Sequence, residues 1–125
     1  MSMVGAGLLL EACGTPLPLL KTSPKNQLLT VPVDKFTGDH TLLVVRSSSL
    51  ENDILLVKKK DSYKALYLKC THENFGLTPT SKKIVCPAHG SQFDLEGNVI
   101  KEPALRPLKE FITELNQNNI IIHLT

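Results

Sequence analysis

Short apolar runs separated by polar turns follow one another along the chain, and they predict β-strands. The first half holds three such runs, at Leu28–Val33, Thr41–Arg46 and Ile54–Lys58. Runs of five or six mostly branched apolar residues between turn signals are typical of strands. Pro32 has no backbone donor, so it places the first run at a sheet edge or at a strand end.

The second half predicts shorter strands and two hairpins. The expected elements are strands Tyr63–Lys69 and Ile84–Val85, a hairpin of Gln92–Asp94 with Asn98–Ile100, and a closing hairpin of Phe111–Leu115 with Ile120–Leu124. The turn of the closing hairpin is Asn116–Asn119, a cluster of turn-forming residues. No segment has the period of a long amphipathic helix. The pattern therefore predicts a small all-β fold, an antiparallel sandwich or barrel.

The first 26 residues have a different pattern. Met1–Leu10 is small and apolar, and the next residues are Glu11, Ala12 and Cys13. This resembles a bacterial lipoprotein cleavage box, with Cys13 as the lipidated first residue and the true start upstream of Met1. Glu11 is atypical of such a box and no basic residue precedes Lys21, so a frayed or docking segment is the alternative.

Gly14–Asn26 contains three prolines and predicts a linker. We therefore divide the chain into a truncated signal-like segment with a proline-rich linker, residues 1–26, and one domain, residues 27–125.

Composition changes this picture little. The chain has 125 residues, 42% hydrophobic and 21% charged, with a net charge of +2. These values are ordinary for one globular domain and argue against an extended nucleic-acid surface. No apolar run reaches about 18 residues, so no full membrane span is predicted.

Candidate chemistry is concentrated in one stretch. Cys70 and His72 form a Cys-x-His pair, and Cys86 and His89 form a Cys-x-x-His pair 13 residues later. Two thiolates and two imidazoles have the number and type of a metal-ligand set. A tetrahedral zinc site is one alternative, although zinc fingers usually pair Cys with Cys and His with His. A Cys–His nucleophile pair and plain buried cysteines are the others.

The residues around these pairs sharpen the interpretation. Gly90-Ser91 follows the second His and Pro103-Ala104 comes later, so residues 67–108 resemble the Rieske iron–sulfur proteins. The resemblance implies a [2Fe–2S] cluster in a lobe of about residues 69–105, inserted at the tip of the β base. Cys70 and Cys86 would hold one iron, and His72 and His89 the other. Neutral imidazoles raise the reduction potential to roughly −150 to +300 mV, against about −400 mV for plant-type clusters.

Several positions depart from family branches. Phe75 and Ala88 stand where one branch has a disulfide between the two boxes, so packing by Phe75 and Pro87 would hold the loops instead. Ser91 matches the high-potential branch, in which its hydroxyl bonds a cluster sulfide and raises the potential. We therefore count Ser91 with the cofactor-binding residues.

The resemblance implies a one-electron carrier or redox subunit rather than a stand-alone enzyme. With an anchor at Cys13 it would be exported, on the periplasmic side of a bacterial membrane, with a cytochrome or quinol-oxidising complex as partner. The alternatives are a cytoplasmic Rieske-type ferredoxin that supplies an oxygenase, and a zinc-stabilised binding module. No nucleic-acid partner is expected.

Overall fold

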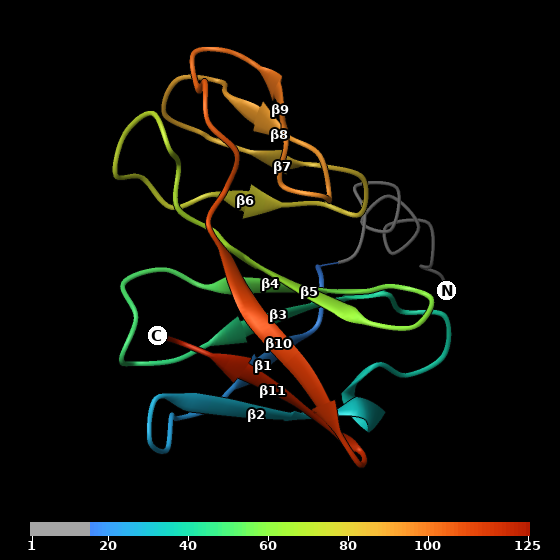
Figure 1. Ribbon diagram of the computed structural model, residues 1–125. Coiled ribbons are helices and arrows are strands. Elements are labelled where there is room, and N and C mark those ends of the chain that lie inside the picture. The colour runs from blue at the N-terminus through green and yellow to red at the C-terminus, as the bar shows by residue number, and fades with distance from the viewer. Residues whose placement is uncertain (1–15) are drawn as a thin grey trace, which may run out of the picture.

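Two β-sheets make up nearly all the regular structure in the computed structural model, which describes residues 16–125 (Figure 1). The large sheet has the order β1-β3-β4-β5-β10-β11-β2. Its strands are β1 (Leu19–Lys21), β2 (Leu28–Pro32), β3 (Leu42–Arg46), β4 (Ile54–Lys58), β5 (Tyr63–Tyr67), β10 (Glu110–Asn116) and β11 (Asn119–His123). The small sheet is β6 (Thr78–Pro79), β7 (Ile84–Val85), β8 (Gln92–Phe93) and β9 (Val99–Lys101). A 3₁₀-helix, η1 (Val33–Lys35), follows β2.

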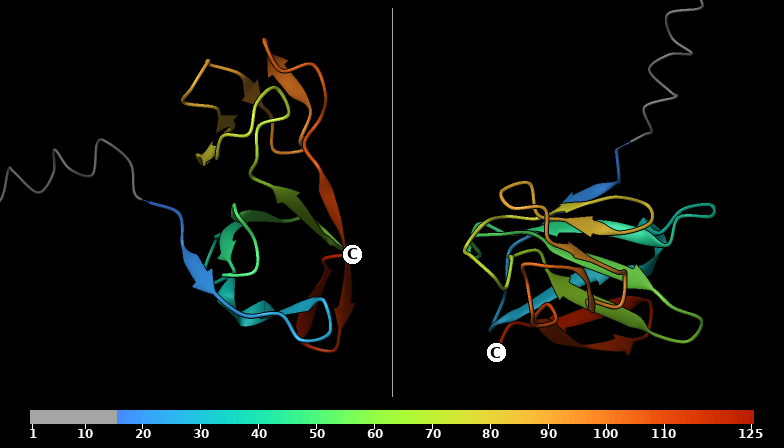
Figure 2. Two further views of the ribbon diagram at one scale, coloured as in Figure 1. Left: turned by 90° about the vertical axis from the view of Figure 1, so that its left-hand side faces the viewer. Right: turned by 90° about the horizontal axis from the view of Figure 1, so that it is seen from above.

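The large sheet curls into the base of the molecule, and the small sheet forms a lobe above it (Figures 1 and 2). The predicted all-β fold, with a base and an inserted lobe, is confirmed. The closing hairpin is also confirmed, because β10 and β11 pair antiparallel from Asn116 opposite Asn119. Pro32 ends β2, the last strand in the sheet order, as its missing donor predicts.

The central strands of the base are buried on both faces, which explains their unbroken apolar runs. Along β4, Ile54 and Leu56 face a core inside the curled sheet, whereas Leu55 and Val57 face a second core under the lobe. β3 alternates in the same way. Side chains of a strand point to opposite faces in turn, so one strand contributes to both cores.

The second core joins the lobe to the base. The lobe contributes apolar side chains from β7 and β8 and both cysteines of the two boxes, and the full set is Leu42, Val44, Leu55, Val57, Leu66, Leu68, Cys70, Leu77, Ile84, Cys86, Phe93, Ala104 and Leu108. Ile84 and Phe93 are fully buried. The two- and three-residue strands of the lobe thus lie on an apolar face that the base provides.

The sequence analysis did not predict two strands. β1 lies within the proline-rich segment that we expected to be a linker, and it pairs in parallel with β3, with Leu19 opposite Val44. Its three residues are too few to outweigh the prolines before and after them. β6 is only Thr78–Pro79. Residues 1–15, including the predicted anchor Cys13, lie outside the described part of the chain.

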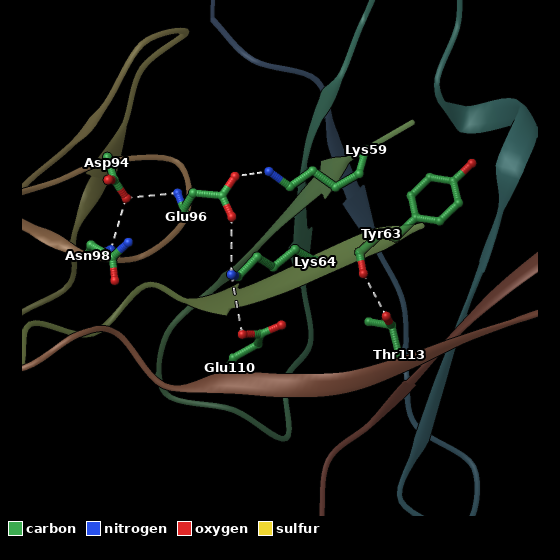
Figure 3. Close-up of polar contacts among 8 residues, drawn as sticks. All are labelled: Lys59, Tyr63, Lys64, Asp94, Glu96, Asn98, Glu110 and Thr113. Atoms are coloured by element: carbon green, nitrogen blue, oxygen red, sulfur yellow. Dashed lines mark hydrogen bonds and ion pairs between the residues drawn. The ribbon is translucent and has the colours of Figure 1, made fainter. Parts of the chain in front are cut away.

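Charged side chains tie the β8–β9 turn to the base (Figure 3). Glu96 in this turn pairs with Lys59 and with Lys64, whose Nζ lies 3.3 Å from Glu96 Oε1. Lys64 also lies 3.5 Å from Glu110 of β10. Asp94 shapes the turn by accepting the backbone N–H groups of Glu96 and Asn98, both at 2.9 Å.

Gly97, between Glu96 and Asn98 in this turn, packs directly on the base. Gly97 has a φ of 90°, and a Cβ there would lie 2.9 Å from Leu66 Cδ2. Glycine therefore permits both the backbone conformation and the close approach.

No helix within residues 16–125 is long and apolar enough to cross a membrane.

Candidate metal centre

Two short loops at the end of the lobe carry the predicted site residues. We call Cys70–Phe75 the first loop and Cys86–Ser91 the second loop. Both close in the same way, because the N–H of the leading cysteine donates to the carbonyl of the residue five positions on, Phe75 (2.9 Å) or Ser91 (2.8 Å). Each loop therefore has its cysteine at the neck and its histidine toward the tip.

The cysteines are buried and close together. Cys70 is 4% exposed and Cys86 1%, and both thiols are free. Burial raises the pKa of the Cys70 thiol. Hydrogen bonds from the backbone of Glu73 and His72, and from the side chains of Cys86 and Ser91, lower that pKa by more, so its net direction is down. The neck of the first loop thus favours the thiolate of Cys70, the form that binds metals.

The histidines lie at the surface above the thiols. His72 and His89 have ring centroids 5.5 Å apart and nearly perpendicular planes, and their side chains are 39% and 46% exposed. Glu73, which the sequence analysis did not single out, lies between them. Its Oε1 is 2.8 Å from His89 Nδ1 and 3.7 Å from His72 Nε2.

Ser91 is fully buried and its hydroxyl has two partners. It accepts the backbone N–H of Ala104 at 3.0 Å, and its interaction with the sulfur of Cys70 is one of the causes that lower the pKa of that thiol. A hydroxyl can donate one bond and accept others, so both contacts are compatible. The predicted bond from Ser91 to a cluster sulfide remains a prediction.

Packing by Phe75 and Pro87 contributes less than we expected. Phe75 lies edge-on to the His89 ring with centroids 6.3 Å apart, but it is 46% exposed, and Pro87 is exposed as well. The first loop also makes a polar contact that the sequence analysis missed. Thr71 and Arg106 exchange two hydrogen bonds across the lobe. Their separation of 35 residues leaves no signal in the local sequence pattern.

Comparison with known proteins identifies the family. Residues 24–112 match the family model of the Rieske [2Fe–2S] domain, so the chain belongs to the Rieske family. This confirms the resemblance and the predicted cofactor, a Rieske [2Fe–2S] cluster. The donors described above fit that cofactor, since they comprise two buried thiols with a lowered pKa at one of them and two solvent-facing imidazoles.

The curated relatives that the chain matches include iron-sulfur subunits of cytochrome b6-f complexes. The chain is 31% identical over 108 residues to the cytochrome b6-f complex iron-sulfur subunit 3 of Nostoc sp.. The matched region covers 82% of this chain and 56% of that subunit. The chain thus spans about half the length of the curated relatives that it matches.

Solved structures share the fold. The plasma membrane Rieske protein PetC3 from Synechocystis PCC 6803 superposes with a TM-score of 0.55 at 28% identity, over 66% of this chain and 85% of PetC3. The ferredoxin of carbazole 1,9a-dioxygenase from Nocardioides aromaticivorans has a TM-score of 0.54 at 18% identity, over 77% of this chain and 95% of the ferredoxin. The second likeness shows the fold alone.

Proposed function

We propose that Cys70 and Cys86 bind the inner iron of the cluster and that His72 and His89 bind the outer iron. The observation that carries this assignment is the layered arrangement of the four side chains. The sulfurs lie together in the core under the lobe, and the imidazoles lie 5.5 Å apart at the surface. A cluster with thiolates on one iron and imidazoles on the other matches both layers.

The spacing favours a two-iron centre over a single zinc ion. Zinc–sulfur and zinc–nitrogen bonds of about 2.3 and 2.0 Å would bring all four ligand atoms to within roughly 4 Å of one another. Within residues 16–125, the group of ligand atoms within 4.8 Å of one another is His72, Glu73 and His89, and it includes neither cysteine. A grouping of the imidazoles without the thiols supports a two-iron centre rather than one zinc ion.

We propose one-electron transfer as the function, in a membrane-associated electron-transfer chain. When bound, a Rieske cluster accepts and releases one electron. The two exposed imidazoles would bring the outer iron within a side chain's depth of a docked protein. Similarity to cytochrome b6-f iron-sulfur subunits supports a cytochrome or quinol-oxidising complex as partner.

A second candidate is a Rieske-type ferredoxin that supplies an oxygenase. Phe75 and Ala88 favour it, because they replace the paired cysteines that the high-potential branch uses to join its loops. A redox titration of the holoprotein separates the two candidates. A potential in the upper part of the roughly −150 to +300 mV Rieske range supports the membrane chain, and one at its lower end supports the ferredoxin.

We also propose export and anchoring through a lipidated Cys13. The Leu10-Glu11-Ala12-Cys13 sequence after an apolar run supports this proposal. Two or more acyl chains on one residue give stable membrane attachment. Cys13→Ser in the full-length precursor should release the protein from the membrane fraction. A soluble wild-type protein with an unmodified Cys13, measured by mass spectrometry, would contradict the anchor.

Iron, zinc and acid-labile sulfide analysis tests the ligand assignment. We expect two iron and two sulfide per chain in the wild type and in a His40→Ala control. His72→Ala and His89→Ala should each lose the Rieske absorption and electron paramagnetic resonance (EPR) spectrum, because each removes one ligand of the outer iron. One zinc per chain without sulfide, or a normal spectrum in both variants, would overturn the assignment.

A further inference from the structure

The segment Pro103–Pro107, which we call the exit segment, contacts both loops of the metal centre. Near its start, the backbone N–H of Ala104 donates to Ser91 Oγ at the end of the second loop, at 3.0 Å. Near its end, the backbone carbonyl of Arg106 accepts a hydrogen bond from Thr71 Oγ1 in the first loop, at 2.7 Å. Two residues of the exit segment, Ala104 and Arg106, thus connect the loops.

The contact with the first loop is reciprocal. While Thr71 Oγ1 donates to the Arg106 carbonyl, Arg106 Nη2 donates back to the Thr71 carbonyl at 3.2 Å. Both contacts place a side chain of one residue on the backbone of the other, so together they fix the two backbones side by side. Within residues 16–125, none of the ion pairs involves the Arg106 guanidinium, and its hydrogen bond goes to Thr71.

The place of Thr71 makes this contact relevant to the site. Thr71 stands between Cys70 and His72, the two proposed ligands of the first loop. A shift of its carbonyl would move the peptide groups that connect both ligands. Cys70 is also held at the neck of the loop by its N–H bond to Phe75. The part of the loop that carries His72 is connected to the exit segment by the hydrogen bonds between Thr71 and Arg106.

We propose that Thr71 and Arg106 are positioning residues that hold the first loop in its cluster-binding conformation. Together with the Ser91–Ala104 bond, they connect two loops that lack the disulfide which one Rieske branch has at the positions of Phe75 and Ala88. The inference rests on the ligand assignment proposed above. It predicts slower release of the cluster when the pair is intact, because release requires the first loop to lift from the exit segment.

The test is the rate of cluster loss from the holoprotein in a fixed excess of an iron chelator, followed by visible absorbance. Thr71→Val removes the hydroxyl donor and keeps the shape, and Arg106→Met removes the guanidinium and keeps the apolar stem. Each variant should lose its cluster about two- to ten-fold faster than the wild type, the factor that one hydrogen bond supplies. In the double variant, the acceleration of cluster loss should be smaller than the product of the accelerations in the two single variants, because the residues act as a unit.

Matched controls separate this role from general stability. Thr80→Val removes a hydroxyl from the β6–β7 turn of the same lobe, where it donates to the Lys83 carbonyl (2.8 Å) and accepts the backbone N–H groups of Lys82 and Lys83. Arg46→Met removes a guanidinium that pairs with Asp53 on the base. Both controls should lose the cluster at the wild-type rate. Thr71→Ser keeps the hydroxyl and should also lose the cluster at the wild-type rate.

The outcomes separate the two proposals. Freshly purified variants should contain two iron and two sulfide and show a Rieske EPR spectrum, broadened in Thr71→Val and Arg106→Met by a wider range of His72 orientations. Cluster present with wild-type loss rates in both variants would overturn the positioning role while the ligand assignment stands. Equal acceleration in Thr80→Val would also overturn it. Absence of iron and sulfide from the wild type would overturn the ligand assignment itself.

Discussion

The base and the lobe are stabilised in different ways. The core inside the base is built from aliphatic and aromatic side chains, and its strands pair over as many as five residues in register, as in β11 with β2. The lobe has strands of two or three residues, and its core includes two cysteines beside a buried serine. Isolated strands of that length are marginal in water. The base can therefore fold from its own side chains, whereas the lobe depends on the base, on loop hydrogen bonds and on its cofactor.

Removing a proposed ligand should have the largest effect, and it should destabilise the lobe far more than the base. Cys86→Ser should abolish the cluster, because the thiolate is lost from the buried layer, and metal-binding free energy is also folding free energy. Hydrogen exchange followed by mass spectrometry should then show rapid exchange in the two loops and in β6–β9. The amides of β4, β10 and β11 should stay protected. Equal loss of protection in base and lobe would show that the two regions fold as one unit.

Two neighbouring leucines can separate the regions by packing alone. Leu55 and Leu56 are both fully buried, but Leu55 faces the lobe and Leu56 faces the core of the base. Each change to Ala should cost about 2–5 kcal/mol of the packing that the leucine makes. Leu56→Ala should lower the free energy of global unfolding measured with denaturant.

Leu55→Ala should in addition release the cluster at denaturant concentrations below the global transition, since it weakens the surface on which the lobe lies. Cluster release that coincides with global unfolding in both variants would contradict separate stabilisation of the lobe.

The contrast also explains how far the sequence predicted the structure. The base was predictable because β3 and β4 carry unbroken apolar runs, and the closing hairpin has an unmistakable turn. The positions of the four proposed ligands were predictable from two short spacings. The Thr71–Arg106 contact, Glu73 and β1 were not, because each depends on which distant segments meet in space. Parallel pairing of β1 with β3, for example, is decided by the path of the chain rather than by three local residues.

A single hydroxyl in the lobe should tune the reduction potential. Ser91→Ala removes the donor beside the Cys70 sulfur, and such a donor favours the more negative, reduced cluster. A hydrogen bond to a charged group contributes on the order of 1.5–3 kcal/mol, of which only part differs between oxidation states. About 1 kcal/mol corresponds to a fall of about 40 mV for one electron. Ser47→Ala, which removes a buried hydroxyl from the base, should leave the potential unchanged. An equal potential in wild type and Ser91→Ala would mean that this hydroxyl does not reach the cluster.

The smallest expected effect is at the electrostatic contact between the two regions. Glu96→Gln keeps the shape of the side chain but removes the charge that pairs with Lys59 and Lys64 (Figure 3). The pairs are partly exposed, so the loss in free energy of unfolding should be about 0.5–1 kcal/mol at low salt. It should shrink as salt rises, because the Debye length falls to about 3 Å at 1 M. Glu51→Gln is the matched control, since Glu51 is more exposed and lies 3.8 Å from Lys69. It should change stability less at every salt concentration. A salt-independent loss in Glu96→Gln would instead assign the effect to the fold of the β8–β9 turn, where the Glu96 backbone N–H is held by Asp94.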